Sequence, residues 1–299
     1  MKIRGVLIED TFAEAFTMRV ARIVITGHST RWVRAAALKL TGFATSVIGC
    51  KCEAGIEREL AASETPDGRP GVGVLLMTMS KDDMGKRLIE RIGQTVLTCP
   101  TTACYDGLPG SPDRVGVGSA LRFFGDGFQS SKVVAGERFW RIPVMEGEFL
   151  VQEKFGMLKG VAGGNFLILA RSADAARAAA EAAADAMASH PGIFLPFPGG
   201  VVRSGSKVGS RRIKSMIAST NDAYCPTLRG RSGVASELPE SVNSVLEIVV
   251  DGLDRPAIET ALRAGIEAAC RPGVVEISAG NYGGKLGKHH FRLHDLVTA

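Results

Sequence analysis

The chain has 299 residues, of which 45% are hydrophobic and 22% are charged, so it has enough apolar material for two domains or one large one. Its formal net charge of +5 is spread thinly, without the dense Lys/Arg blocks of a nucleic-acid arm. No apolar run approaches the ~20 residues that span a bilayer, and the start lacks the apolar stretch of a signal peptide. We therefore expect a cytoplasmic protein that has neither a membrane nor a nucleic acid as a partner.

Hydrophobic periodicity and capping residues predict two β-α-β units in the first half of the chain. Ahead of them, the capping box Thr11-x-x-Glu14 indicates a helix over residues 8–20. The units consist of a strand over 20–26, a helix over 30–40, a strand over 43–50, a strand over 72–79, a helix over 81–93 and a strand over 95–99. Residues 64–71 have turn composition throughout, and residues 100–140 are rich in loops.

The second half repeats this plan after two strands over 139–144 and 148–151. Its units consist of a strand over 164–169, a helix over 173–189, a strand over 192–197, a strand over 245–250, a helix over 255–270 and a strand over 274–278. They align at a constant shift of 81 residues, which places Pro191-Gly192 on Pro272-Gly273. Two β-α-β units side by side form one split-β-α-β sheet, so four of them predict an α+β fold of two ferredoxin-like lobes. The N-terminal lobe is expected to span residues 1–143 and the C-terminal lobe residues 144–299.

One carboxylate lies in the middle of the apolar strand at residues 245–250. In an extended strand Glu247 shares one face with Val245 and Val249, while the alternate residues form a second apolar face. A carboxylate without water or a partner is costly in such surroundings, and its usual escape is a raised pKa. A proton donor at neutral pH needs this property, so Glu247 is the candidate catalytic residue. A Glu at a strand end that simply reaches solvent is the alternative interpretation.

The glycine-rich stretch 280–287 does not match a nucleotide-binding loop. Its Gly280-x-x-x-Gly284-Lys285 run is one residue short of a phosphate loop, and Leu286 stands where Ser or Thr would hold magnesium. No G-x-G-x-x-G lies between a strand and a helix, which argues against a Rossmann site. The glycines indicate either tight bends required by packing or close backbone approach to a flat ligand.

A second polar concentration lies at residues 218–227. Its hydrogen-bonding side chains are Ser219, Thr220, Asn221, Asp222, Tyr224 and Thr227. A solvent-facing turn would explain the Ser-Thr and Asn-Asp pairs but not the Tyr-Cys-Pro that follows, so a ligand-facing loop is an equal alternative.

Cysteines and histidines give no sign of a disulfide or a metal site. The cysteines are Cys50, Cys52, Cys99, Cys104, Cys225 and Cys270, and they contain no C-x-x-C pair. We expect free, buried thiols. His289, His290 and His294 lack a further cluster of ligands, so a terminal strand with solvated imidazoles is favoured over a metal site.

Several long segments together carry a resemblance to a known family. They are residues 8–16, 64–71, 123–127, 160–166, 218–227, 247–253 and 272–287. Through them the chain closely resembles formylmethanofuran–tetrahydromethanopterin formyltransferase along essentially its whole length. The resemblance implies two ferredoxin-like lobes, dimers that pair into a homotetramer, and a site at the subunit interface built mainly by C-terminal lobes. It also implies no metal or tightly bound cofactor, with the methanofuran-type coenzyme and tetrahydromethanopterin acting as substrates in one-carbon metabolism.

The family's proposed catalytic glutamate falls on Glu247 by position. The candidate residues for gripping the two coenzymes lie in the loops described above and in the 163–165 segment. They are Asn165, Ser219, Thr220, Asn221, Asp222, Tyr224, Gly280, Asn281 and Lys285.

Two departures from the archaeal family members concern the source and partners. Those members tend to be strongly acidic, whereas this chain carries +5, and its segment Pro100–Arg114 is shorter and less acidic. Both favour a bacterial branch in which the formyltransferase is a subunit of a formyltransferase/hydrolase complex. An active formyltransferase is the expected function, and a non-catalytic scaffold subunit or a pterin-binding module are the alternatives.

Overall fold

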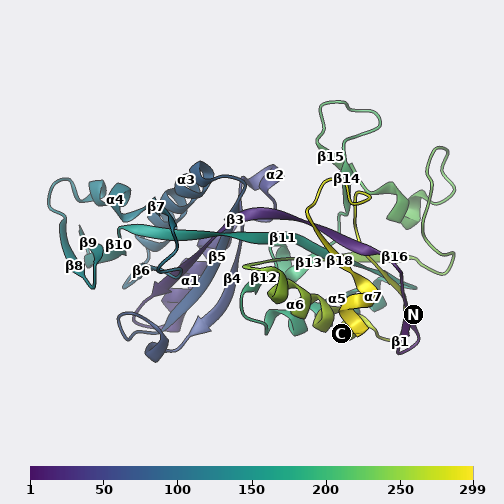
Figure 1. The fold of residues 1–299 in the computed structure, drawn as a ribbon, viewed down its shortest axis with the longest axis horizontal. Coiled ribbons are helices and arrows are strands. Elements are labelled where there is room, and N and C mark those ends of the chain that lie inside the picture. The colour runs from purple at the N-terminus through teal and green to yellow at the C-terminus, as the bar shows by residue number, and fades with distance from the viewer. Residues whose placement is uncertain (299) are drawn as a thin grey trace.

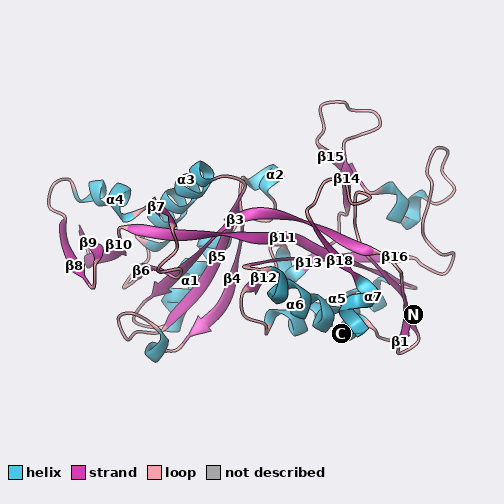
Figure 2. Cartoon of the chain, in the orientation of Figure 1, coloured by secondary structure: helices cyan, strands magenta, loops and turns pink. Residues whose placement is uncertain are grey.

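The structure, a computed structural model, describes residues 1–298. Two lobes lie side by side, and two long strands, β3 (Phe12–Thr26) and β11 (Lys154–Ala170), run across the middle of the molecule (Figure 1). Each lobe combines strands with helices, as the colouring by secondary structure shows (Figure 2). The predicted α+β architecture of two lobes is confirmed.

In the N-terminal lobe, helices cover one face of a mostly antiparallel sheet with the strand order β4-β5-β3-β6-β10-β9-β8. Leu40 of α1 and Leu88 of α3 pack onto Ile23 and Val74 of the sheet in one buried cluster. The elements of this lobe are α1 (Thr30–Thr41), α2 (Val47–Cys50), β4 (Glu53–Leu60), β5 (Gly71–Thr78), α3 (Lys81–Arg91), β6 (Ala103–Asp106), β7 (Asp113–Gly116), α4 (Gly118–Leu121), β8 (Ser130–Val134), β9 (Glu137–Val144) and β10 (Gly147–Gln152).

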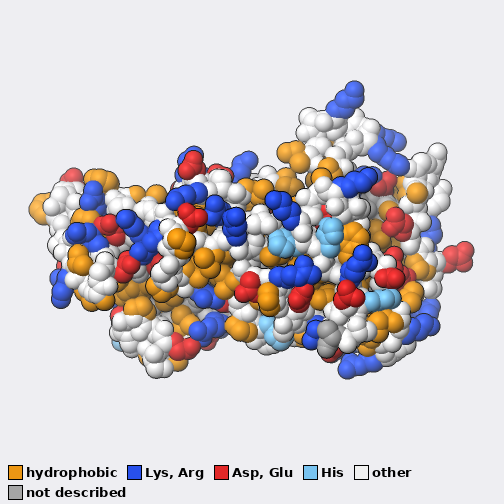
Figure 3. Space-filling model, viewed as in Figure 1, with side chains coloured by type: hydrophobic (Ala, Val, Ile, Leu, Met, Phe, Trp, Pro, Cys, Tyr) orange, Lys and Arg blue, Asp and Glu red, His pale blue; other side chains and the backbone are white. Residues whose placement is uncertain are grey.

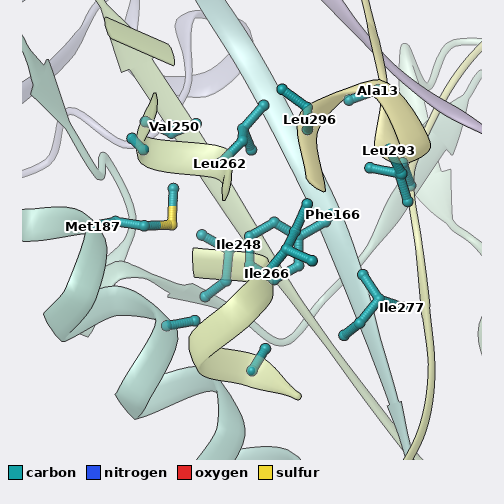
Figure 4. Close-up of a cluster of buried hydrophobic side chains, with 14 of the residues drawn as sticks. Ala13, Phe166, Met187, Ile248, Val250, Leu262, Ile266, Ile277, Leu293 and Leu296 are labelled. Atoms are coloured by element: carbon teal, nitrogen blue, oxygen red, sulfur yellow. The ribbon is translucent and has the colours of Figure 1, made fainter. Parts of the chain in front are cut away.

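In the C-terminal lobe, the sheet order is β2-β17-β11-β16, and α5 and α6 cover one face of it. Phe166 and Ile248 of the sheet meet Leu262 and Ile266 of α6 in the buried core (Figure 4). The elements of this lobe are β1 (Lys2–Ile3), β2 (Val6–Ile8), α5 (Ala173–Ala188), β12 (Ile193–Phe194), β13 (Val201–Val202), β14 (Ser206–Val208), β15 (Ala218–Thr220), β16 (Ser244–Gly252), α6 (Arg255–Ala269), β17 (Val274–Ser278), β18 (His289–Arg292) and α7 (Leu293–Thr298).

Paired strands and a shared apolar cluster join the two lobes. Strand β3 pairs antiparallel with β11 over residues 16–20. Beside this pairing, Leu75 of the N-terminal lobe and Phe194 of the C-terminal lobe belong to one buried cluster. The Gly192 backbone N–H also donates to Glu57 Oε1 across the contact, at 2.8 Å. The lobes therefore form one continuous body.

The two main cores take residues from both ends of the chain. Val6, Ile8 and Ala15 belong to the core of the C-terminal lobe, whereas Phe149 and Phe155 belong to the core of the N-terminal lobe. The predicted boundary between the two lobes, which divides the chain into residues 1–143 and 144–299, stays a prediction. In the structure, the core of each lobe also contains residues that this boundary assigns to the other lobe.

Three predicted elements are wrong. Residues 8–20 form no helix, because β3 begins at Phe12 and its partners β18, β11 and β5 supply strand pairing that overrides the local capping signal. Residues 43–50 form no strand: Ser46 caps the short helix α2, with its Oγ accepting from the Ile48 N–H at 3.4 Å. Residues 95–99 form no strand, because a π turn over Ile92–Val96 continues α3.

Two shorter departures lie in the second half. The strand predicted over 192–197 is limited to the two residues of β12, and His294 lies in helix α7 rather than in a strand. Within residues 1–298, no helix is long and apolar enough to cross a membrane. On the face shown in Figure 3, Lys and Arg lie interspersed with Asp and Glu, which agrees with the thinly spread charge.

Candidate active site

Strand β16 places Glu247 on the face of the C-terminal sheet opposite to α5 and α6. Its neighbours Ile248 and Val250 point into the helix-covered core, where both are fully buried. Glu247 lies directly across from Leu167 of β11 and from Val202 of β13. Val245, Glu247 and Val249 all retain some exposure, so this part of the sheet face is partly open. The predicted strand and its two faces are confirmed.

The Glu247 carboxyl group has no hydrogen-bonding or charged partner among the described residues that shifts its titration. Burial alone raises its pKa to about 7. At neutral pH the group is therefore present in comparable amounts as acid and as carboxylate. This is the condition in which a carboxyl group can both donate and accept a proton.

The glycine-rich loop over residues 280–287 is held beside this face by Glu14. The Glu14 carboxylate is 1% exposed, and it accepts four backbone N–H groups. These come from Tyr282 at 2.7 Å, Gly284 at 2.9 Å, Leu286 at 2.6 Å and Gly287 at 2.5 Å. Burial raises the pKa of Glu14, but the four N–H groups outweigh it and lower the pKa overall. Glu14, interpreted from the sequence as a helix cap, instead anchors this loop.

Asn165, Gly280 and Asn281 use their polar groups to fix the same loop. The Asn165 amide donates to the Gly280 carbonyl at 3.1 Å and accepts the Gly280 N–H at 2.6 Å. The Asn281 amide donates to the Phe12 carbonyl at 3.1 Å. These predicted binding residues therefore hold the loop in place, whereas Lys285 is exposed on the loop.

Tyr282 is a candidate site residue that the sequence-based prediction did not name. Burial raises the pKa of Tyr282, and the nearby charges of Glu247 and Glu14 raise it further. Its ring lies 6.2 Å from the ring of Phe16, centroid to centroid. The only signal in the sequence is an aromatic residue among glycines, and it becomes informative once Glu14 is known to fold the loop back over the sheet.

The second predicted loop divides into two parts. Strands β14 and β15 form a hairpin at the edge of the C-terminal lobe (Figure 1), in which Ser219 donates to the Gly209 carbonyl at 2.6 Å. In the same hairpin the Lys207 ammonium, with Arg211 at 3.4 Å, holds the pKa of Asp222 below its usual range. Thr220 and Asn221 lie beside them at the end of β15.

Tyr224 leaves the hairpin and packs on the sheet face that carries Glu247. It joins a small apolar cluster with Leu167, which lies directly across from Glu247, and Leu169, which lies across from Val245. Its hydroxyl lies 3.5 Å from Ser278 Oγ on β17. Of the residues predicted in this loop, Tyr224 is thus brought to the Glu247 face, while Ser219 and Asp222 form the hairpin's own contacts.

The Glu247 face is partly covered, because Leu167 and Leu169 are buried in a cluster with Tyr224, Leu238 and Val242, while Glu247 itself keeps some exposure. Two surface hollows of about 440 Å³ and 380 Å³ lie on the N-terminal lobe, the first lined by α3 and β7 and the second by α1 and residues 94–100. Sites for small ligands usually bury most of the ligand surface. Within one copy of the chain, part of this face stays uncovered at Val245, Glu247 and Val249.

Comparison with known proteins gives matches over the whole chain. The family model described as "Formylmethanofuran-tetrahydromethanopterin formyltransferase" matches residues 1–144, and that described as "FTR, proximal lobe" matches residues 147–296. A curated relative from Methylobacillus flagellatus, named formylmethanofuran–tetrahydromethanopterin formyltransferase, is 58% identical and covers 100% of both chains.

Two solved structures share the fold. The formyltransferase from Methanosarcina barkeri superposes with a TM-score of 0.93 at 51% identity, covering 99% of this chain and 100% of that one. A chain of the formyltransferase/hydrolase complex from Methylorubrum extorquens, solved with methylofuran, gives a TM-score of 0.95 at 48% identity, covering 99% and 98%.

Proposed function

Because the chain belongs to the formylmethanofuran–tetrahydromethanopterin formyltransferase family, we propose that Glu247 is the acid of its formyl transfer. The reaction moves a formyl group between the amine of a methanofuran-type coenzyme and N5 of tetrahydromethanopterin. One observation carries the proposal: the Glu247 carboxyl group, which lies on a partly open part of its sheet face, has its pKa raised to about 7 by burial alone.

The chemistry requires a donor at this position. A formamide carbonyl is a poor electrophile, and negative charge develops on its oxygen when the incoming amine attacks. The neutral form of Glu247 donates a hydrogen bond to that oxygen or a proton to the departing amine. The Tyr282 hydroxyl, beside Glu247, is a second neutral donor, because a tyrosine is protonated at neutral pH and the pKa of Tyr282 is raised further.

The loops around Glu247 position the two coenzymes. Asn165 and Glu14 hold the 280–287 loop in place through its backbone, so that Tyr282 and Lys285 face the coenzymes. Tyr224 borders the other end of the Glu247 face. Holding two long, mobile coenzymes with their reacting atoms about 3–3.5 Å apart supplies much of the acceleration. Both coenzymes act as substrates, and this mechanism uses no tightly held cofactor.

A second copy of the chain covers the rest of the Glu247 face. Large apolar side chains are exposed over both lobes, including Phe43, Phe128, Met145 and Ile217. Exposed apolar surface of this kind is typical of subunit interfaces. We infer a homo-oligomer, a dimer of dimers, with hydrolase subunits as further partners. The M. extorquens relative, which was solved as part of a formyltransferase/hydrolase complex, supports the second inference.

Glu247→Gln tests the proposed role. The amide keeps the shape and the hydrogen-bonding capacity of Glu247 but cannot act as an acid, so turnover should fall by about 10²–10⁴-fold while folding and coenzyme affinity persist. Glu276→Gln is the matched control, because Glu276 lies on β17 on the same sheet face and its pKa is also raised by burial. The purified chain is assayed with formyl-tetrahydromethanopterin and the furan coenzyme.

The same assay separates the alternatives. Wild-type turnover excludes a scaffold subunit and a pterin-binding module, and full turnover in Glu247→Gln would remove Glu247 from the mechanism.

A further inference from the structure

A pair of carboxyl groups meets at the contact between the two lobes, away from the residues that touch the coenzymes. Glu53 begins β4 in the N-terminal lobe, and Asp251 lies near the end of β16 in the C-terminal lobe. Each side chain shifts the titration of the other, so the two lie close enough to hydrogen-bond once one of them carries a proton. Asp251 is completely buried, and Phe194 of β12 lies opposite it in the sheet.

Each carboxyl group also accepts one backbone N–H. Glu53 Oε1 accepts the Val47 N–H of α2 at 3.1 Å, and Asp251 Oδ1 accepts the Gly163 N–H at 2.8 Å. The buried atom Asp251 Oδ2 has no hydrogen-bond partner within residues 1–298. A proton on the Asp251 carboxyl group accounts for this arrangement, because Asp251 can then donate a hydrogen bond to Glu53. Both carboxyl groups then have a hydrogen-bonding partner.

Two neighbouring buried carboxyl groups cannot both be ionised without strong repulsion between their charges. Burial raises the pKa of Asp251 well above its usual range, and the negative charge of Glu53 raises it further. Burial likewise raises the pKa of Glu53. No other charged group shifts the titration of either residue. Glu57, which also lies at the lobe contact, is paired with Arg22 at 2.6 Å.

The pair is connected to the transfer site by a chain of hydrogen bonds. Strand β11 has one extra residue between Val161 and Gly164, and in this bulge Gly163 adopts φ +86° and points its N–H at Asp251. The Gly163 carbonyl accepts from the Asn165 amide at 3.1 Å. The same amide makes both hydrogen bonds to Gly280, where the loop that carries Tyr282 begins.

The pair is too far from Glu247 to exchange a proton with it. Asp251 and Glu247 share one face of β16, and four residues of strand separate them by about 13 Å. Any effect of the pair on the reaction is therefore carried by position, through the bulge and Asn165.

We propose that Asp251 and Glu53 share one proton across the lobe contact, and that this hydrogen bond positions the Gly163 bulge and the 280–287 loop for coenzyme binding. Asp251 and Glu53 are positioning residues and touch no substrate. The inference deepens the proposed function, on which its kinetic consequence rests. Loss of the shared proton places two negative charges face to face, separates the lobes at this point and loosens the loop beside Glu247.

Asp251→Asn tests the shared proton directly. The amide keeps an acceptor for Gly163 and a donor for Glu53 without needing a proton, so the variant should fold. The folded-state pKa of Asp251 is raised, so its contribution to stability is present below the unfolded-state pKa and is lost as pH rises toward the folded-state pKa. Urea unfolding across a pH series should thus show wild-type stability falling with pH, with a slope shallower by about one proton in Asp251→Asn. Glu59→Gln, an exposed change on the same strand as Glu53, should keep the wild-type slope.

Kinetics give the second readout. In the wild type, KM for the coenzymes should rise at alkaline pH, and Asp251→Asn should remove that rise while leaving the pH dependence of kcat unchanged. Asp251→Ala, which breaks the link to Gly163, should lose kcat/KM by roughly 10–100-fold. In Glu53→Gln the amide oxygen can accept the Val47 N–H and the amide NH₂ group can donate to Asp251. This variant should therefore keep a low KM for the coenzymes at all pH values.

The proposal is overturned if Asp251→Asn keeps the wild-type proton count or the alkaline rise in KM. The number of protons linked to unfolding is measured without the enzymatic reaction. Failure of the carboxyl pair can therefore be distinguished from failure of the proposed transfer reaction. An unchanged slope in an active enzyme refutes the pair, whereas an inactive wild-type chain refutes the proposed transfer reaction.

Discussion

Glu14→Gln should loosen the 280–287 loop more than any other single polar substitution near the site. The carboxylate accepts two N–H groups on each oxygen: Tyr282 and Gly284 on Oε2, Leu286 and Gly287 on Oε1. The amide keeps one oxygen and turns an NH₂ group toward the other two donors. Each buried donor left without an acceptor costs about 1–3 kcal/mol, so the substitution should cost about 2–6 kcal/mol.

This loss is comparable to the whole stability of many domains, so it should appear first as local opening of the loop. Hydrogen exchange at the amides of Tyr282, Gly284, Leu286 and Gly287 measures that opening, and urea unfolding measures the global effect. Coenzyme KM should rise together with the exchange rates, because the loop flanks Glu247. Asp10→Asn is the control, since that carboxylate is 78% exposed and should change stability by no more than about 0.5 kcal/mol.

The decrease in the free energy of unfolding at acid pH gives a further check on Glu14. The four N–H groups lower its folded-state pKa, so its contribution is present above the unfolded-state pKa of about 4.3 and is lost as pH falls through the folded-state value. In Glu14→Gln, the free energy of unfolding should therefore depend less on pH in this acid range. If the variant matched the wild type in unfolding free energy and in loop exchange, the assignment of Glu14 as the anchor of the loop would be wrong.

Three further outcomes follow from the geometry. Because the pKa of Glu247 is about 7 and its acid form is the donor, turnover should decline above about pH 7, and Glu247→Gln should lack that decline. Gly287→Ala should cost roughly 2–4 kcal/mol, because an added Cβ would lie 2.5 Å from the Ala15 carbonyl oxygen, whereas Gly49→Ala, with open space around it, should be nearly neutral in thermal unfolding. Sedimentation and activity measured across a dilution series should fall together if a second copy covers the Glu247 face, and a stable, fully active monomer would contradict that cover.

Local patterns were sufficient to predict the elements whose signals lie within one segment. The strand around Glu247 and the helix α6 were predicted because β-branched runs and the 3.6-residue period are local properties. The raised pKa of Glu247 followed from the same reasoning, since burial on an apolar strand is its sole cause.

The failures have one physical origin, which is dependence on distant partners. Strand β3 was predicted in part as a helix because Thr11-x-x-Glu14 satisfies a capping pattern, but Glu14 binds a loop 268 residues further along the chain. Tyr282 and the Glu53–Asp251 pair were missed because their roles exist only after the loop folds back and the lobes meet. No periodicity within either segment records those contacts.

The crossing strands explain why a site in the C-terminal lobe depends on the beginning of the chain. The first part of β3 lies in the C-terminal lobe and supplies Glu14 and Phe16 to the loop around Glu247, while its last part forms the centre of the N-terminal sheet. Glu53 reaches the same site from the N-terminal lobe through Asp251 and the bulge of β11. Each lobe therefore holds one end of the hydrogen-bond network that positions the loop. Under the proposed mechanism, a change in how the lobes meet acts on the geometry around Glu247 through this network, without a substitution at any residue proposed to bind the coenzymes.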